Sequence, residues 1–415
     1  MKLCSTTVQV LSVVAVLAVA GCDKGEDEKK EKETTEEKAA KDDEPEPSRE
    51  GPLKPLPKKV DDVDMAKVEI GRRLYFDPFL SGDDSISCAS CHSFEHGGAD
   101  GMRTSTGVDG QKGPIASPTV LNSRYNFKQF WDGRAGDLAH QAEGPVANDI
   151  EMGNTWEEAV KKLEGDEWYT EKFGEVYDGE LTMKNVTHAI AEYEETLVTP
   201  APFDEYLRGD DEAISEAAKM GYEEFKSVGC TTCHTGLAVG GTMFQKMGLV
   251  NSYFDELDRP LLEPDLGRYN VTENEADKYK FKVPTLRNIE LTAPYFHDGS
   301  VKELDEAVRQ MAHLQLGKEL SDEQVSNLVA FLESLTGELP ETASAPEGFE
   351  RAVSTPPQKA AEEDPYTLAE QGDPPTDLLV GGEGEGEGKE GAEAEGGEGA
   401  PTVEAKDNGP GAAAE

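Results

Sequence analysis

Two Cys-x-x-Cys-His motifs are the residues of this 415-residue chain whose types and spacing most directly predict chemistry. They are Cys88/Cys91/His92 and Cys230/Cys233/His234. A helical turn places two such thiols over the vinyl groups of a haem, and the next residue presents imidazole to the iron. Two Cys-x-x-Cys pairs could instead build one tetrahedral zinc site. The histidine after each second cysteine favours covalent haem, with His92 and His234 as proximal ligands.

The sixth iron ligands decide whether two haems make an electron carrier or an enzyme. A methionine raises the reduction potential and closes the iron to small molecules, whereas an open iron beside an acid–base group can activate peroxide. On residue type alone, a methionine on an amphipathic helix most often packs in a core. The two motifs by themselves therefore leave both functions open.

The elements expected to position these motifs are helices. Apolar residues recur at helical spacing in six stretches. These stretches are 65–75, 155–163, 183–197, 212–225, 301–311 and 321–335. Ser321 and Gln324 form a capping box at the start of the last one. No sustained strand alternation is present, so we expect a mainly α fold with two small haem domains, one over residues 60–200 and one over 201–340.

The N-terminus has the pattern of an exported lipoprotein. Lys2 precedes an apolar run from Val8 to Ala20, which is too short to span a bilayer. The run ends in a lipobox-like stretch, which predicts a signal peptide over 1–21 and lipidation of Cys22. With Cys4 removed in the signal, no thiol is left for a disulfide. The chain should therefore be periplasmic and anchored to a bacterial membrane by lipid.

Both flanks of the helical region are acidic and low in apolar residues. Residues 22–59 are rich in Glu, Lys and Asp with Pro towards the end, and residues 341–415 are rich in Gly, Glu, Pro and Ala, so we expect disordered tails there. The chain carries 85 acidic and 40 basic residues, a net charge of −45. Repulsion from phosphates excludes nucleic acid as a partner, while a basic protein partner is compatible with this charge.

Between Ile70 and Gly337 the chain resembles the bacterial dihaem cytochrome c peroxidases. Besides the two motifs, six segments carry the resemblance. They are Gln111-Lys112-Gly113-Pro114, Ser117-Pro118-Thr119-Val120-Leu121-Asn122, Phe130-Trp131-Asp132-Gly133-Arg134, Gly144-Pro145-Val146 with Glu151-Met152, Ala201-Pro202-Phe203-Asp204-Glu205-Tyr206-Leu207-Arg208-Gly209, and Leu286-Arg287-Asn288-Ile289-Glu290-Leu291-Thr292-Ala293-Pro294-Tyr295-Phe296-His297. The resemblance implies two cytochrome c-like domains packed against each other and the reduction of hydrogen peroxide to water.

The family's functional residues fall on four positions of this sequence. The resemblance makes Glu151 the distal catalytic glutamate of a low-potential, peroxidatic first haem, with Gln141 beside it. Trp131 matches the tryptophan between the haems, and Met311 matches the sixth ligand of a high-potential second haem. Electrons would enter at that second haem from a small cytochrome c or blue-copper protein, and members of the family usually form homodimers.

Two positions depart from the family pattern. Val108 stands where many members carry a histidine that blocks the peroxidatic iron until the other haem is reduced, so the first iron should be open in the oxidised protein. Ala116 stands where the family has a calcium-binding asparagine. Thr292 and Pro294 match the two carbonyl ligands of that site, and calcium tolerates mixed oxygen ligands, so Ca²⁺ binding is left open.

Two other functions compete with peroxide reduction. The related methylamine-utilisation maturase oxidises tryptophans on a partner protein and carries tyrosine on its second haem, so Met311 argues against it. The other alternative is a non-catalytic electron carrier or redox sensor, against which Glu151 argues in its family context.

Overall fold

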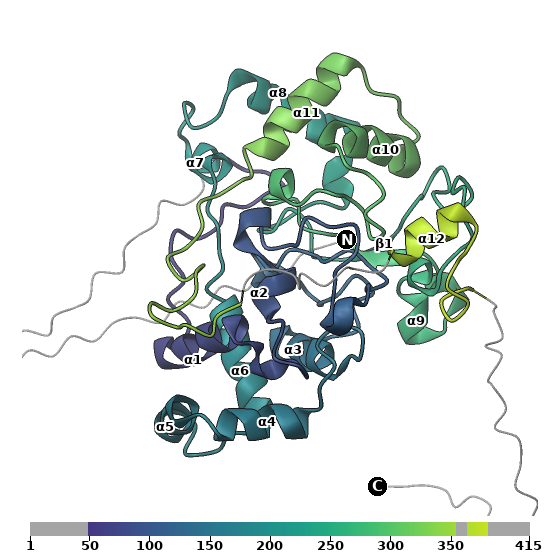
Figure 1. Cartoon of the computed structure of the whole chain (residues 1–415). Coiled ribbons are helices and arrows are strands. Elements are labelled where there is room, and N and C mark those ends of the chain that lie inside the picture. The colour runs from purple at the N-terminus through teal and green to yellow at the C-terminus, as the bar shows by residue number, and fades with distance from the viewer. Residues whose placement is uncertain (1–48, 354–362, 381–415) are drawn as a thin grey trace, which may run out of the picture. The chain divides into compact units, whose positions relative to one another are not determined.

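The computed structural model describes residues 49–353 and 363–380, which belong to one compact unit, and it is mainly helical as expected (Figure 1). The helices are α1 (Met65–Phe76), α2 (Cys88–Cys91), α3 (Leu138–Ala147), α4 (Trp156–Glu164), α5 (Glu167–Val176), α6 (Met183–Glu194), α7 (Pro202–Arg208), α8 (Glu216–Val228), α9 (Tyr269–Thr272), α10 (Leu304–Leu316), α11 (Asp322–Glu333) and α12 (Pro365–Gln371). Strands β1 (Phe244–Lys246) and β2 (Lys280–Lys282) form a small antiparallel sheet, with Phe244 opposite Lys282.

Each of the six stretches predicted to be helical contains a helix, namely α1, α4, α6, α8, α10 and α11. The predicted capping box is confirmed, because the backbone N–H of Gln324 donates to Ser321 Oγ at 3.2 Å and the N–H of Ser321 donates to Gln324 Oε1 at 3.1 Å. Helices α3, α5, α7 and α12 were not predicted. Helix α3 has Pro145 in its last turn, and Pro at that position hides a helix from a periodicity argument.

The same helix crossing occurs in residues 60–200, here called the first half, and in residues 201–340, the second half. Helix α1 packs across α6, and α8 packs across α11. A Cβ atom on Gly71 would lie 1.8 Å from the carbonyl oxygen of Ala189, and one on Gly221 would lie 1.9 Å from that of Asn327. Each crossing therefore requires glycine at the point of contact.

Further pairs of residues show that the two halves repeat one another. Asn122 and Asn288 both adopt φ of 60°, and both donate a side-chain hydrogen bond of 2.8 Å to Thr199 Oγ1. Phe130 and Phe296 both have positive φ, of 68° and 71°. The loops between the paired helices thus follow one plan, and Thr199 joins them.

The expected disorder was wrong for part of the N-terminal flank. Leu53 and Leu56 are 1% and 0% exposed, and the N–H of Leu56 donates to Asp204 Oδ1 at 2.9 Å. Leu53 belongs to the apolar cluster of the second half, together with Phe331. The two buried leucines help to hold this proline-rich segment against the second half, an effect that its average composition does not predict.

The C-terminal flank is also partly ordered. The guanidinium of Arg351 pairs with Asp77 at 2.7 Å and with Asp166 at 2.8 Å. Helix α12 buries Tyr366 completely, and Leu379 forms a β-bridge with Leu262. Here aromatic and charged residues hold the segment, as two leucines do in the N-terminal flank, although the overall composition of both flanks predicts disorder.

Several sequence predictions lie outside the described residues. These are the signal peptide over 1–21, the lipidation of Cys22, the tether up to residue 48, and the segments 354–362 and 381–415. Within residues 49–353 and 363–380, no helix is long and apolar enough to cross a membrane. The division into domains over 60–200 and 201–340 remains a prediction.

Candidate functional site

The first motif begins a short helix and buries its histidine. Cys88 and Cys91 bound α2, and His92 follows as its C-cap. The Nδ1 atom of His92 lies 3.2 Å from the carbonyl oxygen of Gly98 and 3.1 Å from Ser117 Oγ. A ring held at Nδ1 leaves Nε2 for a metal, and burial lowers the pKa of His92, which favours the neutral form that ligates iron.

The second motif has the same local arrangement. Cys230 opens a 3-10 turn, and His234 follows Cys233. The Nδ1 atom of His234 lies 3.3 Å from the carbonyl oxygen of Val239, and burial lowers the pKa of this histidine to about 4. In both motifs burial favours the neutral imidazole, and a backbone carbonyl orients the ring through Nδ1.

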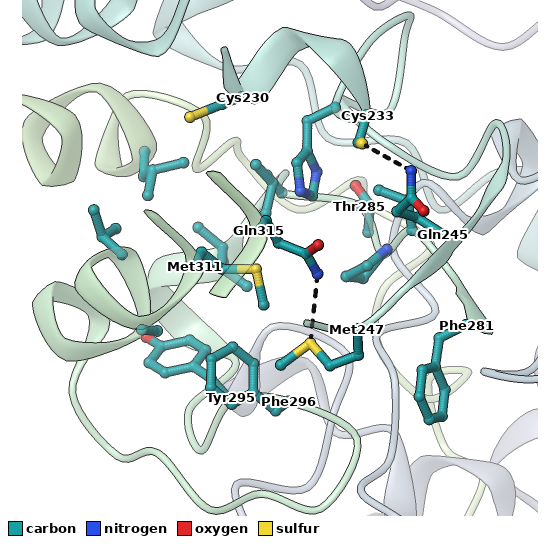
Figure 2. Close-up of a pocket in the computed structure, with 18 of the residues that line it drawn as sticks. Cys230, Cys233, Gln245, Met247, Phe281, Thr285, Tyr295, Phe296, Met311 and Gln315 are labelled. Atoms are coloured by element: carbon teal, nitrogen blue, oxygen red, sulfur yellow. Dashed lines mark hydrogen bonds between the residues drawn. The ribbon is translucent and has the colours of Figure 1, made fainter. Parts of the chain in front are cut away.

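A cavity with largely apolar walls surrounds the second motif. Figure 2 shows the side chains of Cys230 and Cys233 on one side of this space and Met311, from α10, on the opposite side. Two thiols, an imidazole and a thioether around an apolar cavity are the donor set that a covalently bound haem requires. The residues therefore fit the group, with Cys230, Cys233 and His234 placed to hold it.

The described residues do not support the zinc alternative. No group of three or more His, Cys, Asp or Glu side chains in residues 49–353 and 363–380 converges as a metal site would require. The two motifs, each with its own histidine, serve separate sites.

A second methionine, which the sequence reasoning missed, lines the same cavity. Figure 2 shows Met247 near Met311, and Gln315 Nε2 approaches the Met247 sulfur at 3.8 Å while also donating to the carbonyl oxygen of Lys246 at 3.2 Å. Because Gln315 engages the sulfur of Met247, Met311 remains the predicted sixth ligand. Met247 follows β1 and lies outside the predicted helices, so no pattern in the sequence marked it as a residue of the site.

Glu151 lies in the turn that follows α3, near the first motif. Its carboxylate accepts a hydrogen bond of 2.8 Å from Asn148 Nδ2. Burial raises the pKa of Glu151, while the charge of Arg134 and the bond from Asn148 act in the opposite direction. Burial and the charge of Asp100 raise the pKa of the Cys91 thiol, and the charge of Glu151 adds to this effect, so the Glu151 carboxylate lies within electrostatic range of the first motif.

The loop that carries Val108 is attached directly to this turn. The N–H of Val108 donates to the carbonyl oxygen of Glu151 at 2.9 Å, and Val108 is 6% exposed. A Cβ on Gly107 would lie 1.9 Å from the carbonyl oxygen of Ile150, so the two backbones touch. Val108 also packs in the apolar cluster that contains Met152.

Gln141 and Trp131 occupy different places. Gln141 is half-buried on α3, the helix that leads to Glu151. Trp131 lines the cavity of the second motif, donates from Nε1 to the carbonyl oxygen of Ala116 at 2.9 Å, and lies edge-on to Phe281 with ring centroids 6.4 Å apart. The indole therefore contacts the second half from a loop of the first, and its role between two haems remains a prediction.

The residues predicted to bind calcium also line this cavity. Thr292, Pro294 and Ala116 are all part of its wall. The carbonyl oxygen of Ala116 already accepts the indole N–H of Trp131, and its N–H donates to the carbonyl oxygen of His297 at 2.8 Å. Calcium binding at Thr292 and Pro294 remains a prediction.

Comparison with known proteins gives a consistent result. The family described as di-haem cytochrome c peroxidase matches residues 65–212. The cytochrome c peroxidase Ccp of Escherichia coli is 50% identical over 292 residues, which cover 70% of this chain and 62% of that protein. The cytochrome c551 peroxidase of Nitrosomonas europaea is 48% identical over 292 residues, covering 70% of this chain and 85% of that one.

A solved structure agrees with the sequence matches. The crystal structure of a MauG-like protein associated with microbial copper homeostasis superimposes with a TM-score of 0.61 at 26% identity, and covers 72% of this chain and 98% of that one. The chain therefore belongs to the di-haem cytochrome c peroxidase family, whose members are oxidoreductases that act on peroxide.

Proposed function

We propose that this protein reduces hydrogen peroxide to water with electrons from a small periplasmic redox protein. Electrons would pass from the second site, with His234 and Met311, to the first site, with His92. The observation that carries this proposal is the partly buried carboxylate of Glu151, which accepts a hydrogen bond from Asn148 and lies within electrostatic range of Cys91 in the first motif.

A haem bound at the first motif supplies the redox-active iron for this reaction. Glu151 accepts a proton from the near oxygen of peroxide and returns it to the far oxygen, so that water can leave. Burial supports this task, because the raised pKa moves the carboxyl closer to the pH at which it works. Gln141, on the helix before Glu151, would help to orient the substrate.

The second site is suited to receive electrons. Met311 and His234 both line one apolar cavity, and ligation of a haem iron by a thioether and an imidazole would favour a high reduction potential. Trp131 lies in the wall of the same cavity but belongs to a loop of the first half. This placement supports a role for the indole as an electron relay between the sites.

Val108 supports a first site that is open in the fully oxidised protein. Its side chain cannot ligate iron, and its loop is hydrogen-bonded to the Glu151 turn. A loop that is already hydrogen-bonded to the backbone of this turn, and that has no iron ligand at position 108, would not have to move away from the iron before peroxide binds. The enzyme would then work without prior reduction of the second haem.

Two alternatives are less well supported. A maturase that oxidises tryptophans on a partner would carry tyrosine at the second haem, where this chain places Met311 in the cavity. A non-catalytic electron carrier would not need a buried, hydrogen-bonded carboxylate at Glu151.

Other parts of the proposal rest on the sequence. Cys22 would anchor the protein to a membrane by lipid, the enzyme would be a homodimer, and Thr292 and Pro294 would offer carbonyl oxygens to Ca²⁺. The donor would be a cytochrome c or a blue-copper protein, steered by the charge of −45 if it is basic.

The decisive experiment measures peroxide turnover by the dihaem protein with a reduced c-type cytochrome as donor. Fully oxidised enzyme is compared with enzyme whose second haem has been reduced beforehand. We expect equal initial rates and a spectrum of the oxidised protein with one high-spin and one low-spin haem. An absence of peroxide consumption in both states would refute the proposed peroxidase activity. Two low-spin haems in the oxidised protein would refute the proposal that the first iron is open.

A further inference from the structure

The last residue of α6, Glu194, is a buried acid that the proposed mechanism does not use. It is 5% exposed. Its place in the fold can be matched in the second half through the two helix crossings. A Cβ on Gly71 would lie 2.9 Å from Tyr193 Cβ, and a Cβ on Gly221 would lie 2.9 Å from Phe331 Cβ.

The residue after each of these aromatic side chains therefore occupies the same position. In the first half it is Glu194, and in the second half it is Leu332, which is also 5% exposed. One fold thus accommodates either a carboxyl or an isobutyl group at this point. Packing alone does not require an acid here, because the second half does without one.

The surroundings of Glu194 are unfavourable to a carboxylate. Its Oε2 atom is fully buried and has no hydrogen-bond partner among the described residues. The titratable groups within electrostatic range of Glu194 are Tyr75 of α1, Cys88 of α2, and its chain neighbours Tyr193 and Glu195. Of these, Glu195 is the charged one, and its carboxylate pairs with Arg124 at 2.9 Å. Cys88 also packs against the apolar cluster that contains Tyr75 and Tyr193.

A buried carboxyl without a partner is stable only as the neutral acid. Desolvation by burial raises the pKa of Glu194 to about 8, and the neighbouring Glu195 adds to this effect. The carboxyl of Glu194 is therefore mostly protonated at neutral pH, and a change in nearby charge would change the fraction that is protonated. A haem attached at Cys88 would be a source of such a change, because Glu194 and Cys88 lie within electrostatic range of each other.

We infer that Glu194 is a proton-binding site linked to the redox state of the first haem. One electron reaching the first site adds a negative charge close to Cys88, and one proton from solvent is then taken up or retained by the Glu194 carboxylate. Oxidation of the site releases that proton. The linkage follows from electrostatics, because a nearby added negative charge increases the proton affinity of a carboxylate in a medium of low dielectric.

This role extends the proposed function, on which it rests for the haem at Cys88. Reduction of one hydrogen peroxide to two waters consumes two electrons and two protons. A proton held beside the first site, at a position distinct from Glu151, keeps the charge of the site balanced as each electron arrives. The second half, with Leu332 in the same place, transfers electrons without holding a proton.

The test is a spectroelectrochemical titration of the dihaem protein between pH 6 and pH 9. In the wild type we expect the midpoint potential of the first haem to fall with rising pH and that of the second haem to change little. Glu194→Gln keeps the shape and removes the titration, and Glu194→Leu copies the second half. Both variants should lose the slope at the first haem, whereas Glu195→Gln, a charge removed one residue away, should keep it.

Proton uptake gives a second measurement. Reduction of the wild type in weak buffer should take up protons, seen with a pH indicator, and the two Glu194 variants should take up fewer. The inference is overturned if Glu194→Gln keeps the wild-type slope, or if the wild-type first haem shows none. Neither measurement uses peroxide, so a dihaem protein without peroxidase activity would refute the proposed function and still allow this linkage to be judged.

Discussion

The two halves of this protein share one scaffold and differ in the side chains placed on it. Both have a helix crossing at a glycine, a Cys-x-x-Cys-His motif and an imidazole oriented by a backbone carbonyl. Acids distinguish the first half, with Glu151 beside the motif and Glu194 behind it. Sulfur and apolar groups distinguish the second, with Met311 in its cavity and Leu332 in place of the buried acid.

Under the proposed function, this difference separates a catalytic site from an electron-transfer site within one repeated fold. A haem with an imidazole on one side and a thioether on the other exchanges electrons and leaves no position for a substrate. Replacing the thioether by open space, and adding a carboxyl whose pKa is raised, creates a place where protons and electrons meet. The chemistry thus depends on a few side chains, while the shared backbone keeps the two sites alike.

The largest effect on the difference between the two halves should come from removing the Glu151 carboxyl of the first half. Glu151→Gln keeps the shape and the hydrogen-bonding capacity but cannot take a proton. Because a positioned general acid–base group contributes about 100- to 10,000-fold, we expect turnover of peroxide to fall within that range. The spectra of both haems should stay as in the wild type. Near-normal turnover would mean that the two sites do not differ in the way described.

The next test removes the thioether of the second half. Met311→Leu should convert the second haem from a closed to an open iron, lower its reduction potential and reduce donor-driven turnover roughly tenfold. Met247→Leu is the matched control, since Met247 lines the same cavity but is engaged by Gln315. Absorption and magnetic circular dichroism report the ligand. If Met247→Leu alone produces these changes, the ligand assignment is wrong.

The sequence predicted much of the scaffold and less of what surrounds the sites. Helical periodicity located six helices, and motif spacing located both histidines, because these signals are local. Met247 and Asn148 were not recognised, because Met247 contacts Gln315, which is 68 residues away, and Asn148 acts within an irregular turn that has no periodic pattern. The buried acid Glu194 could have been found by aligning the two halves on their Cys-x-x-Cys-His motifs and flanking helices.

The segments around Leu53, Arg351 and Tyr366 show why composition wrongly predicted disorder in parts of the flanks. Each of these residues supplies a large share of the fixed contacts of its segment, through a buried leucine, a double ion pair or a buried ring. Average hydrophobicity dilutes one such residue among many acidic neighbours. Tertiary contacts, rather than local propensity, order these segments.

A smaller effect should follow from removing the hydrogen bond to Glu151 while its carboxyl is kept. Asn148→Ala deletes the hydrogen bond of 2.8 Å to Glu151. That bond favours the ionised carboxyl, so its loss raises the pKa of Glu151 further. Glu151 must be ionised to accept a proton, and activity is lost as pH falls through its pKa. The acidic limb of the pH–rate profile should therefore move up by about one unit, since a hydrogen bond to a charge contributes about 1.5–3 kcal/mol.

Asn154→Ala is the matched control for that shift. Asn154 is in the same turn and donates to the carbonyl oxygen of Leu80 at 3.0 Å, but it does not touch Glu151. It should lower stability without moving the acidic limb. Equal profiles for the two variants would show that Asn148 only shapes the turn.

The smallest effect concerns the residue at the boundary of the halves. Trp131→Phe keeps a ring against Phe281 but loses the indole, its lower oxidation potential and its hydrogen bond to Ala116. We expect electron transfer from the second haem to the first to slow severalfold, measured by stopped-flow mixing of half-reduced enzyme with peroxide. Trp156→Phe is the control, because its indole donates to the carbonyl oxygen of Glu143 at 3.0 Å within the first half. If both variants slow equally, the loss reflects packing, and the two sites exchange electrons by a path that does not use Trp131.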